Sequence, residues 1–333
     1  IRGPAMLRIF EIADACLKRR QLDLSAGVVI PETALWIDLY APTAEEARKA
    51  EAFLEIALPT KEEMEEIEAS SRVYVEDGGL FMTTSIVSKT ETEHPESAAV
   101  TFVLAKNRLL TIRYSEPMPF NTFPARAERQ PGMWATADYL LVGILEAIVD
   151  RTADILERVG ADVDSLSRES FDKPRHNQAL DHRDFQGLLS RLGRQNDLIG
   201  KVRESLIGFS RILTFLTQTF EGKPGGKELR SYNKTITRDV ASLADHTNFL
   251  SNKITFLLDA ILGMINLEQN RIIKVISVSS VVFLPPTLFA SVWGMNFAHM
   301  PELQEPWAYP VALAIIIVSA IIPAAYFKIR GWL

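Results

Sequence analysis

The order of hydrophobic and polar positions changes character once along this chain, near residue 130. Before that point, short apolar runs alternate with turn signals, which is typical of an α+β domain over residues 1–130. The turns Asp77-Gly78-Gly79 and Lys106-Asn107-Arg108 each separate two such runs and predict hairpins. The runs that we expect to form strands are Leu7–Ala13, Leu35–Tyr40, Val73–Val75, Leu80–Val87, Ala98–Leu104 and Leu109–Tyr114.

Two helices are expected among these strands, because two capping boxes occur there. Thr43 is followed by Glu46 and Thr60 by Glu63, and each pair satisfies two free backbone donors at the start of a helix. The two segments carry nine glutamates between positions 45 and 68. This acidic surface is either a solvated helix face or a surface that attracts cations.

From Met133 onward the apolar positions recur with the period of a helix. Residues 134–171, about 181–220 and about 229–293 predict three long helices, of which the first two would form a helical hairpin over 131–228. The third contains a seven-residue repeat, which is typical of a packed helical seam. Its members are Ile236, Val240, Leu243, Thr247, Leu250, Ile254, Leu257, Ile261 and Met264.

Two later stretches, residues 275–293 and 306–327, contain no charged side chain over 19 and 22 positions. Both are long enough to cross a hydrocarbon core about 30 Å thick, which excludes a wholly soluble protein. No turn signal separates the first stretch from the helix before it. We therefore expect a stalk helix over 229–293 with its membrane part at about 272–293, an outer loop at 294–305, a second span at 306–327 and a basic tail at 328–333.

Basic residues indicate how the spans are oriented. Arg271 and Lys274 precede the first span, Lys328 and Arg330 follow the second, and the segment 296–305 between the spans contains no Lys or Arg. Because cytoplasmic flanks are enriched in Lys and Arg, both termini and the large N-terminal region are expected in the cytoplasm. This arrangement describes a multi-pass protein in the lipid bilayer of the cell inner or plasma membrane.

Two spans cannot enclose an aqueous path, so any pore must form between several copies of the chain. A polar stripe in lipid faces protein or water, although Ser and Thr also bond back to their own helix. The first span has such a stripe on one helical face: Asn270, Ser277, Ser280, Leu284, Thr287 and Ser291.

Two further features of the first span bear on gating. Ile273, Ile276 and Leu284 would form dry rings that gate by dewetting. Pro285-Pro286 removes two backbone donors and predicts either a hinge or a fixed bend.

Composition and charge argue against several other functions. The chain has 36 Lys and Arg against 42 Asp and Glu, and this net charge of −6 does not support a nucleic-acid-binding surface. The single cysteine, Cys16, cannot form an intrachain disulfide. The segment Gly222–Lys227 lacks the spacing of a phosphate-binding loop, and no catalytic motif occurs, so we expect no enzyme activity and no organic cofactor.

The first span is followed by Trp293-Gly294-Met295-Asn296-Phe297 and then by Met300-Pro301-Glu302. Together with the two C-terminal spans and the basic tail, this segment resembles the signature of the CorA family of divalent-cation transporters. In layout the resemblance covers nearly the whole chain. It implies a funnel-shaped homopentamer that conducts Mg²⁺, and in some members Co²⁺ or Ni²⁺. Without a nucleotide motif, uptake would be driven by the membrane potential.

The resemblance also implies roles for residues at the outer mouth. Gly294, Met295 and Asn296 match the motif that forms the selectivity ring. Mg²⁺ sheds its water reluctantly, so Asn296 side chains would hold the hydrated ion by neutral carbonyl oxygens. Glu302 and Glu305 would attract cations to the mouth, although Glu302 would also suit a loop salt bridge or a helix cap.

Inside the path, Thr287 and Asn270 stand where family channels have polar rings, and Leu284 and Ile276 stand where they have hydrophobic rings. Asp259 lies three helical turns before Asn270, and it would either continue the path into the cytoplasm or form a surface ion pair. The family also implies closure when cytoplasmic Mg²⁺ occupies acidic sites between soluble domains, and the sequence does not select the ligands of those sites.

Two alternative functions remain open from the sequence. A zinc-transporting branch of the same superfamily lacks the Phe-x-x-Met-Pro-Glu continuation after the triplet, which favours magnesium here. A membrane-anchored coiled-coil scaffold, in which the spans only tether the protein, predicts no polar stripe.

Overall fold

The computed structural model describes residues 6–20, 30–92, 94–171, 182–223, 225–296, 300–301 and 305–332. These residues divide into two compact units, with boundaries between Gln186 and Gly187 and between Phe256 and Leu257, each inside a helix. The strands are β1 (Met6–Ala13), β2 (Cys16–Arg20), β3 (Ala34–Tyr40), β4 (Val73–Glu76), β5 (Gly79–Ser88), β6 (Glu96–Ala105) and β7 (Arg108–Arg113). The helices are α1 (Ala44–Leu54), α2 (Lys61–Glu65), α3 (Ala69–Arg72), α4 (Pro119–Ala127), α5 (Ala137–Phe171), α6 (His182–Thr219), α7 (Gly226–Trp293) and α8 (Ala308–Ile329).

The strands form one seven-stranded sheet in the order β2-β1-β3-β7-β6-β5-β4. Its neighbours pair antiparallel except for β3 and β7, which are parallel. Every predicted strand is confirmed to within two residues at each end. Both predicted hairpin turns are also confirmed, with positive φ at Asp77 and Gly78 and at Lys106 and Asn107. Tight two-residue hairpin turns of the primed type need this conformation.

The sequence interpretation missed β2, the one-turn helix α3 and α4. The turn before β2 consists of Asp14 and Ala15, with φ of 55° and 60°. Alanine rarely adopts positive φ, so this pair carries no turn signal in the sequence. Helix α4 contains Pro124 in its interior, a residue that ordinarily interrupts a helix.

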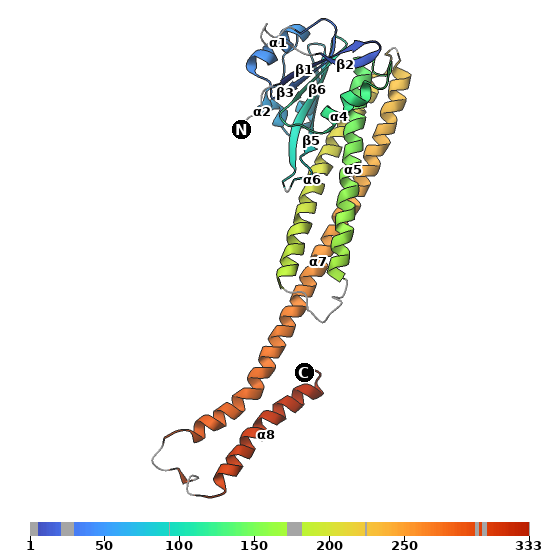
Figure 1. Cartoon of the computed structure of the whole chain (residues 1–333). Helices are drawn as coiled ribbons and strands as arrows, with labels where there is room; N and C mark the ends of the chain where they lie inside the picture. Colours follow the sequence, from blue (N-terminus) through green and yellow to red (C-terminus); the bar gives the residue numbers. More distant parts are fainter. Residues whose placement is uncertain are drawn as a thin grey trace. The chain divides into compact units, whose positions relative to one another are not determined.

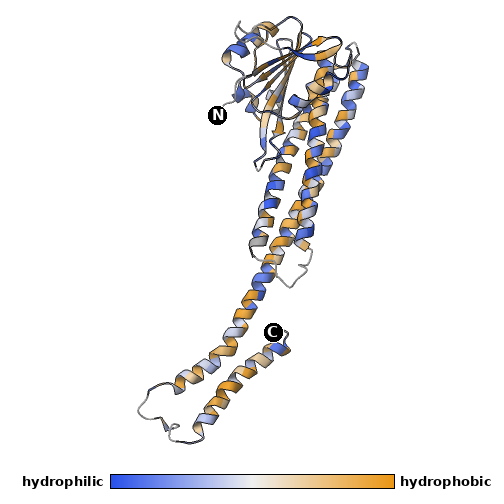
Figure 2. Ribbon diagram, in the orientation of Figure 1, coloured by the Kyte–Doolittle hydropathy of each residue, from blue (hydrophilic) through white to orange (hydrophobic). Residues whose placement is uncertain are grey.

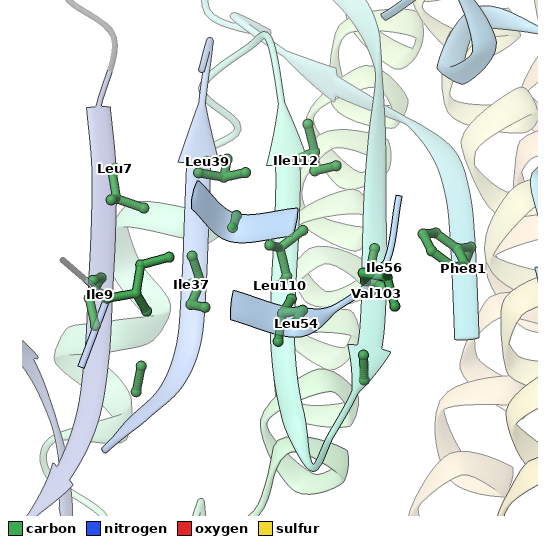
Figure 3. Close-up of a cluster of buried hydrophobic side chains, with 14 of the residues drawn as sticks. Leu7, Ile9, Ile37, Leu39, Leu54, Ile56, Phe81, Val103, Leu110 and Ile112 are labelled. Atoms are coloured by element: carbon green, nitrogen blue, oxygen red, sulfur yellow. The ribbon is translucent and has the colours of Figure 1, made fainter. Parts of the chain in front are cut away.

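Helices α1 and α2 cover one face of the sheet. Both predicted capping boxes are confirmed, since Thr43 and Thr60 accept hydrogen bonds from the N–H groups of Glu46 and Glu63 and each glutamate accepts one in return. The core beneath these helices combines residues of the helical segment with alternate strand residues (Figure 3). Its labelled members are Leu7, Ile9, Ile37, Leu39, Leu54, Ile56, Phe81, Val103, Leu110 and Ile112.

An aromatic cluster lies against the other face of the sheet. Trp36 stacks on Phe10 with ring centroids 4.3 Å apart, and Phe120 and Phe123 of α4 lie within 6.4 Å of the same indole. Arg113 and Asp38 form an ion pair of 2.9 Å beside this cluster, and both side chains are fully buried. The sheet is therefore the middle of three layers.

The predicted helical hairpin corresponds to α5 and α6, and the first part of α7 packs beside them as the third helix of a bundle (Figure 1). Gln195 donates to Asp162 between α6 and α5, Lys253 pairs with Asp164 between α7 and α5, and Asn233 donates to the α6 backbone. The predicted seven-residue repeat is the buried face of α7. Two of its members, Leu243 and Met264, are half-buried, and the others are buried: Ile236, Val240, Thr247, Leu250, Ile254, Leu257 and Ile261.

The second unit contains the later part of α7 and the helix α8. Both helices are long and apolar enough to cross a membrane. Helix α8 covers residues 308–329 against the expected span of 306–327, because the helix continues past the apolar run through Lys328. Figure 2 shows α8 as predominantly hydrophobic and the last turns of α7 as a mixture of hydrophobic and more hydrophilic residues.

Candidate ion path along α7

The residues predicted to line a pore share one exposed face of α7. The polar members Asn270, Ser277, Ser280, Thr287 and Ser291 are all exposed in the single chain. The apolar members are exposed to a similar degree, at 60% for Ile273, 61% for Ile276 and 67% for Leu284. This face is therefore free to contact other copies of the chain.

Two hydroxyls of the stripe already have an acceptor within the helix. Ser280 donates to the carbonyl oxygen of Ile276 at 2.9 Å and Thr287 donates to that of Phe283 at 2.7 Å. Such back-bonding lets a hydroxyl lie in lipid at low cost, yet it leaves the oxygen lone pairs facing outward. The helix also remains continuous through Pro285 and Pro286, up to Trp293.

The opposite face of the same span is less exposed. Val278 is 4% exposed there. Helix α8 runs antiparallel to this part of α7 (Figure 1), and the Lys274 ammonium lies 5.6 Å from the centre of the Trp332 ring. We attribute the low exposure of this face to α8, which leaves the stripe uncovered. The half-buried residues on this face are Val282, Pro285, Pro286 and Trp293.

The stripe continues beyond the membrane part of α7. Towards the N-terminus, exposed side chains with oxygen-bearing groups follow one another at the same steps of three, four or seven residues. A hydrated Mg²⁺ ion is held by such oxygens. The sequence interpretation selected only Asp259 from this set, although the spacing that revealed the buried repeat would also have revealed the others: Asp245, Asn248, Asn252, Thr255 and Asn266.

Asp259 itself is exposed, and among the described residues no cation lies within 4 Å of its carboxylate. The alternative of a surface ion pair thus finds no support in the described part of the chain. Nor do the described residues assemble any group of three His, Cys, Asp or Glu side chains able to hold a metal ion.

The Gly-Met-Asn triplet follows directly on the last residue of α7. The Gly294 N–H donates to the carbonyl of Ala290 at 2.9 Å, and the Met295 N–H donates to that of Val292 at 3.4 Å. A Cβ on Gly294 would lie 3.0 Å from the Ala290 oxygen, so the end of the helix is tight at this position. Asn296 follows outside the helix with an exposed side chain.

Of the two glutamates expected near the mouth, Glu302 lies outside the described residues. Glu305 is exposed and accepts a hydrogen bond of 3.1 Å from the Trp307 indole. One carboxylate oxygen is thus engaged, and the charge still faces solvent.

A polar cluster links α7 to the rest of the first unit. Glu146 of α5 accepts hydrogen bonds from Arg126 of α4 and Tyr232 of α7. Burial, together with the hydrogen bond to Glu146, raises the pKa of the Tyr232 hydroxyl far above its usual range. Burial and the charge of Glu146 also raise the pKa of the Asp150 carboxyl. The cluster therefore joins three helices at neutral pH with Tyr232 protonated.

Known proteins resemble this chain over nearly its full length. The protein named magnesium transport protein CorA from Escherichia coli strain K12 is 36% identical over 328 residues, which cover 98% of this chain and 100% of that protein. The structure of the CorA magnesium transporter from Methanocaldococcus jannaschii superposes with a TM-score of 0.72 at 19% identity and covers 100% of both chains.

A further solved structure shares the fold over part of the chain. The ZntB cytoplasmic domain from Vibrio parahaemolyticus superposes with a TM-score of 0.56 at 9% identity, covering 79% of this chain and 99% of that domain. Sequence is more specific, since residues 31–328 match the family described as CorA-like Mg²⁺ transporter protein. On this match and the identity to its curated members, the chain belongs to the CorA-like Mg²⁺ transporter family.

Proposed function

We propose that this protein is an Mg²⁺ uptake channel in the inner or plasma membrane, assembled as a homopentamer around α7. The observation that carries the proposal is the exposed stripe of α7, which runs from the cytoplasmic part of the helix to the Gly-Met-Asn triplet at its end. A single chain leaves this face uncovered, and a ring of copies would enclose it. Family membership supports Mg²⁺ as the ion.

Asn296 would act as the selective group at the outer mouth. Its carboxamide is exposed beyond the last turn of α7, where the copies would converge. Neutral carbonyl oxygens are suited to a hydrated Mg²⁺ ion, which keeps several of its waters when bound. The charge of Glu305, and that of Glu302, would raise the local cation concentration at this mouth.

The driving force would be the membrane potential. A divalent ion that moves through about 100 mV gains roughly 4.6 kcal/mol, twice the value for one charge. The positions of Arg271, Lys274, Lys328 and Arg330 support cytoplasmic termini, so the negative interior would draw the ion from the Asn296 end towards Asp259. Passage of Co²⁺ and Ni²⁺ is part of the same proposal.

We further propose that cytoplasmic Mg²⁺ closes the channel by binding between the soluble domains of neighbouring copies. The nine glutamates of the α1–α2 region supply carboxylates of the kind that hard cations prefer. If this is right, saturating Mg²⁺ protects the first unit of the full-length oligomer from a protease, while K⁺ at the same ionic strength does not. Identical digestion in both salts would contradict the proposed closure by cytoplasmic Mg²⁺ but would not bear on the proposed Mg²⁺ transport.

The transport proposal is tested by ion uptake into proteoliposomes under a negative-inside potential. Mg²⁺ and Zn²⁺ are compared for the unsubstituted chain, for Asn296→Ala, and for Asn196→Ala, which removes an exposed carboxamide from α6. We expect Mg²⁺ flux that Asn296→Ala abolishes or makes unselective and that Asn196→Ala leaves unchanged. Zn²⁺ flux without Mg²⁺ flux would contradict the proposal that Mg²⁺ is the transported ion, although the fold would be unaffected. No flux of either ion from a folded oligomer would favour a membrane-anchored scaffold.

A further inference from the structure

A basic hollow lies at the N-terminal end of α7, where α6 turns into α7. It has a volume of about 830 Å³ and belongs entirely to the first unit. Its walls carry four cationic side chains and several hydroxyls, and Figure 2 shows the first turns of α7 as hydrophilic. The residues that matter here are Thr217, Lys223, Lys227, Arg230, Ser231 and Lys234.

The cations of this hollow are only partly neutralised by the chain itself. Lys223 pairs with Asp138 at 3.0 Å, whereas Arg230 reaches Glu221 only at 3.6 Å, and Glu221 is 73% exposed. Within the described ranges, neither Lys227 nor Lys234 has a carboxylate within 4 Å. A chain with a net charge of −6 thus carries a local positive charge at this hollow.

The spacing of these cations makes their accumulation costly for the helix. Lys227, Arg230 and Lys234 are separated by three and four residues, so their side chains are neighbours on one exposed face of α7. Like charges at these spacings destabilise a helix. A bound anion would relieve the repulsion, and the exposed Ser231 hydroxyl can donate a hydrogen bond to its oxygens. The Thr217 hydroxyl already donates to the carbonyl oxygen of Leu213, so it lines the hollow without a free donor.

The volume and position of the hollow restrict the anion that it would take. A space of about 830 Å³ is in the range of small-molecule sites and far exceeds what a single phosphate ion needs. Lys234 precedes Lys274 by 40 residues in the sequence, so the hollow is not part of the segment that flanks the membrane span. A soluble ligand with several phosphate groups satisfies both restrictions.

We propose that this hollow binds a soluble polyphosphate anion, such as a nucleoside triphosphate, through Lys227, Arg230 and Lys234. The test is calorimetric titration of the full-length protein in detergent, with Mg²⁺ removed, using inorganic triphosphate, ATP and sulfate as probes. Lys227→Gln/Lys234→Gln is compared with Lys49→Gln/Lys61→Gln, which removes the same charge from a half-buried position on α1 and an exposed position on α2. Lys227→Arg/Lys234→Arg keeps the charge at the hollow.

We expect triphosphate to bind saturably at one site per chain, more than tenfold tighter than sulfate, and the Gln pair at the hollow to weaken it at least tenfold. The Arg pair and the control pair should bind within a factor of two or three of the unsubstituted chain. Equal affinities for ATP and triphosphate would mean that the site recognises the phosphate groups alone. A higher affinity for ATP would mean that the site also contacts the nucleoside.

Equal affinity of the two Gln pairs, equal affinity for sulfate, or no binding by the folded protein would overturn the proposal. If the unsubstituted protein does not bind triphosphate and the Lys227→Gln/Lys234→Gln variant no longer forms oligomers, the basic surface would be assigned to a contact with a second copy of the chain. The titration does not depend on ion flux. A negative titration would therefore not contradict the proposed Mg²⁺ transport, and a negative transport assay would not contradict anion binding at the hollow.

Discussion

The ion pair between Asp38 and Arg113 shows what a single charge contributes in the first unit. Both side chains are fully buried, and Asp38 also accepts a hydrogen bond of 2.8 Å from Thr111. Asp38→Asn would leave the guanidinium buried without its counter-charge, and we expect it to lower the free energy of unfolding by about 3–5 kcal/mol. Denaturant unfolding of the purified full-length protein measures this change.

A matched surface pair provides the control. Lys89 and Glu96 lie 2.8 Å apart with both side chains about half exposed, so Lys89→Gln should leave unfolding nearly unchanged. Equal changes in the free energy of unfolding for Asp38→Asn and Lys89→Gln would contradict the burial of the Asp38–Arg113 ion pair.

Individual residues differ in how far the sequence reveals them. The stripe of α7 and the triplet Gly294-Met295-Asn296 were evident, because their spacing and order lie within one segment. The pair Asp38–Arg113 was not, since its members are 75 positions apart and only the parallel pairing of β3 with β7 brings them together. The basic hollow was hidden for a similar reason, because its volume depends on the α6–α7 turn.

At the scale of elements, α6 is fixed to the sheet through a glycine. A Cβ on Gly208 would lie 2.0 Å from the Thr84 Oγ1 and 2.9 Å from its Cβ, and Thr84 belongs to the middle of β5. Gly208→Ala should therefore push α6 away from β5 and cost about 1–3 kcal/mol of unfolding free energy.

Another glycine of the same helix serves as the control. A Cβ on Gly200 would meet nothing within 4 Å, so Gly200→Ala should instead stabilise the protein by about 1 kcal/mol through helix propensity. Thermal unfolding of both variants decides the matter. Stabilisation by both substitutions would show that α6 does not contact β5 at Gly208.

Elements were predicted best where one period persists. The buried repeat from Ile236 to Ile261 and six of the seven described strands followed from pattern alone, since helix and strand periods differ. Strand β2 and helix α4 depended on Ala15 at positive φ and on Pro124 inside a helix, which only tertiary packing accommodates. The side of α7 that α8 covers also had no sequence signal, since both helices are apolar there.

At the scale of the whole molecule, we infer that one face of α7 lines an Mg²⁺ path and the opposite face does not. Two neighbouring serines allow these two faces to be compared experimentally. Ser280 lies on the stripe, Ser279 lies about 100° away around the helix, and both are exposed in the single chain. Because the chain has a single cysteine, Cys16→Ser provides a background in which each serine can be replaced by the only thiol.

The most direct test is Mg²⁺ flux through Ser280→Cys and Ser279→Cys proteoliposomes, before and after a positively charged methanethiosulfonate reagent, with labelling quantified by mass. We expect the reagent to block flux through Ser280→Cys and to leave Ser279→Cys conducting. Equal block at both positions, or unchanged flux through fully labelled Ser280→Cys, would contradict the claim that the stripe of α7 lines the ion path.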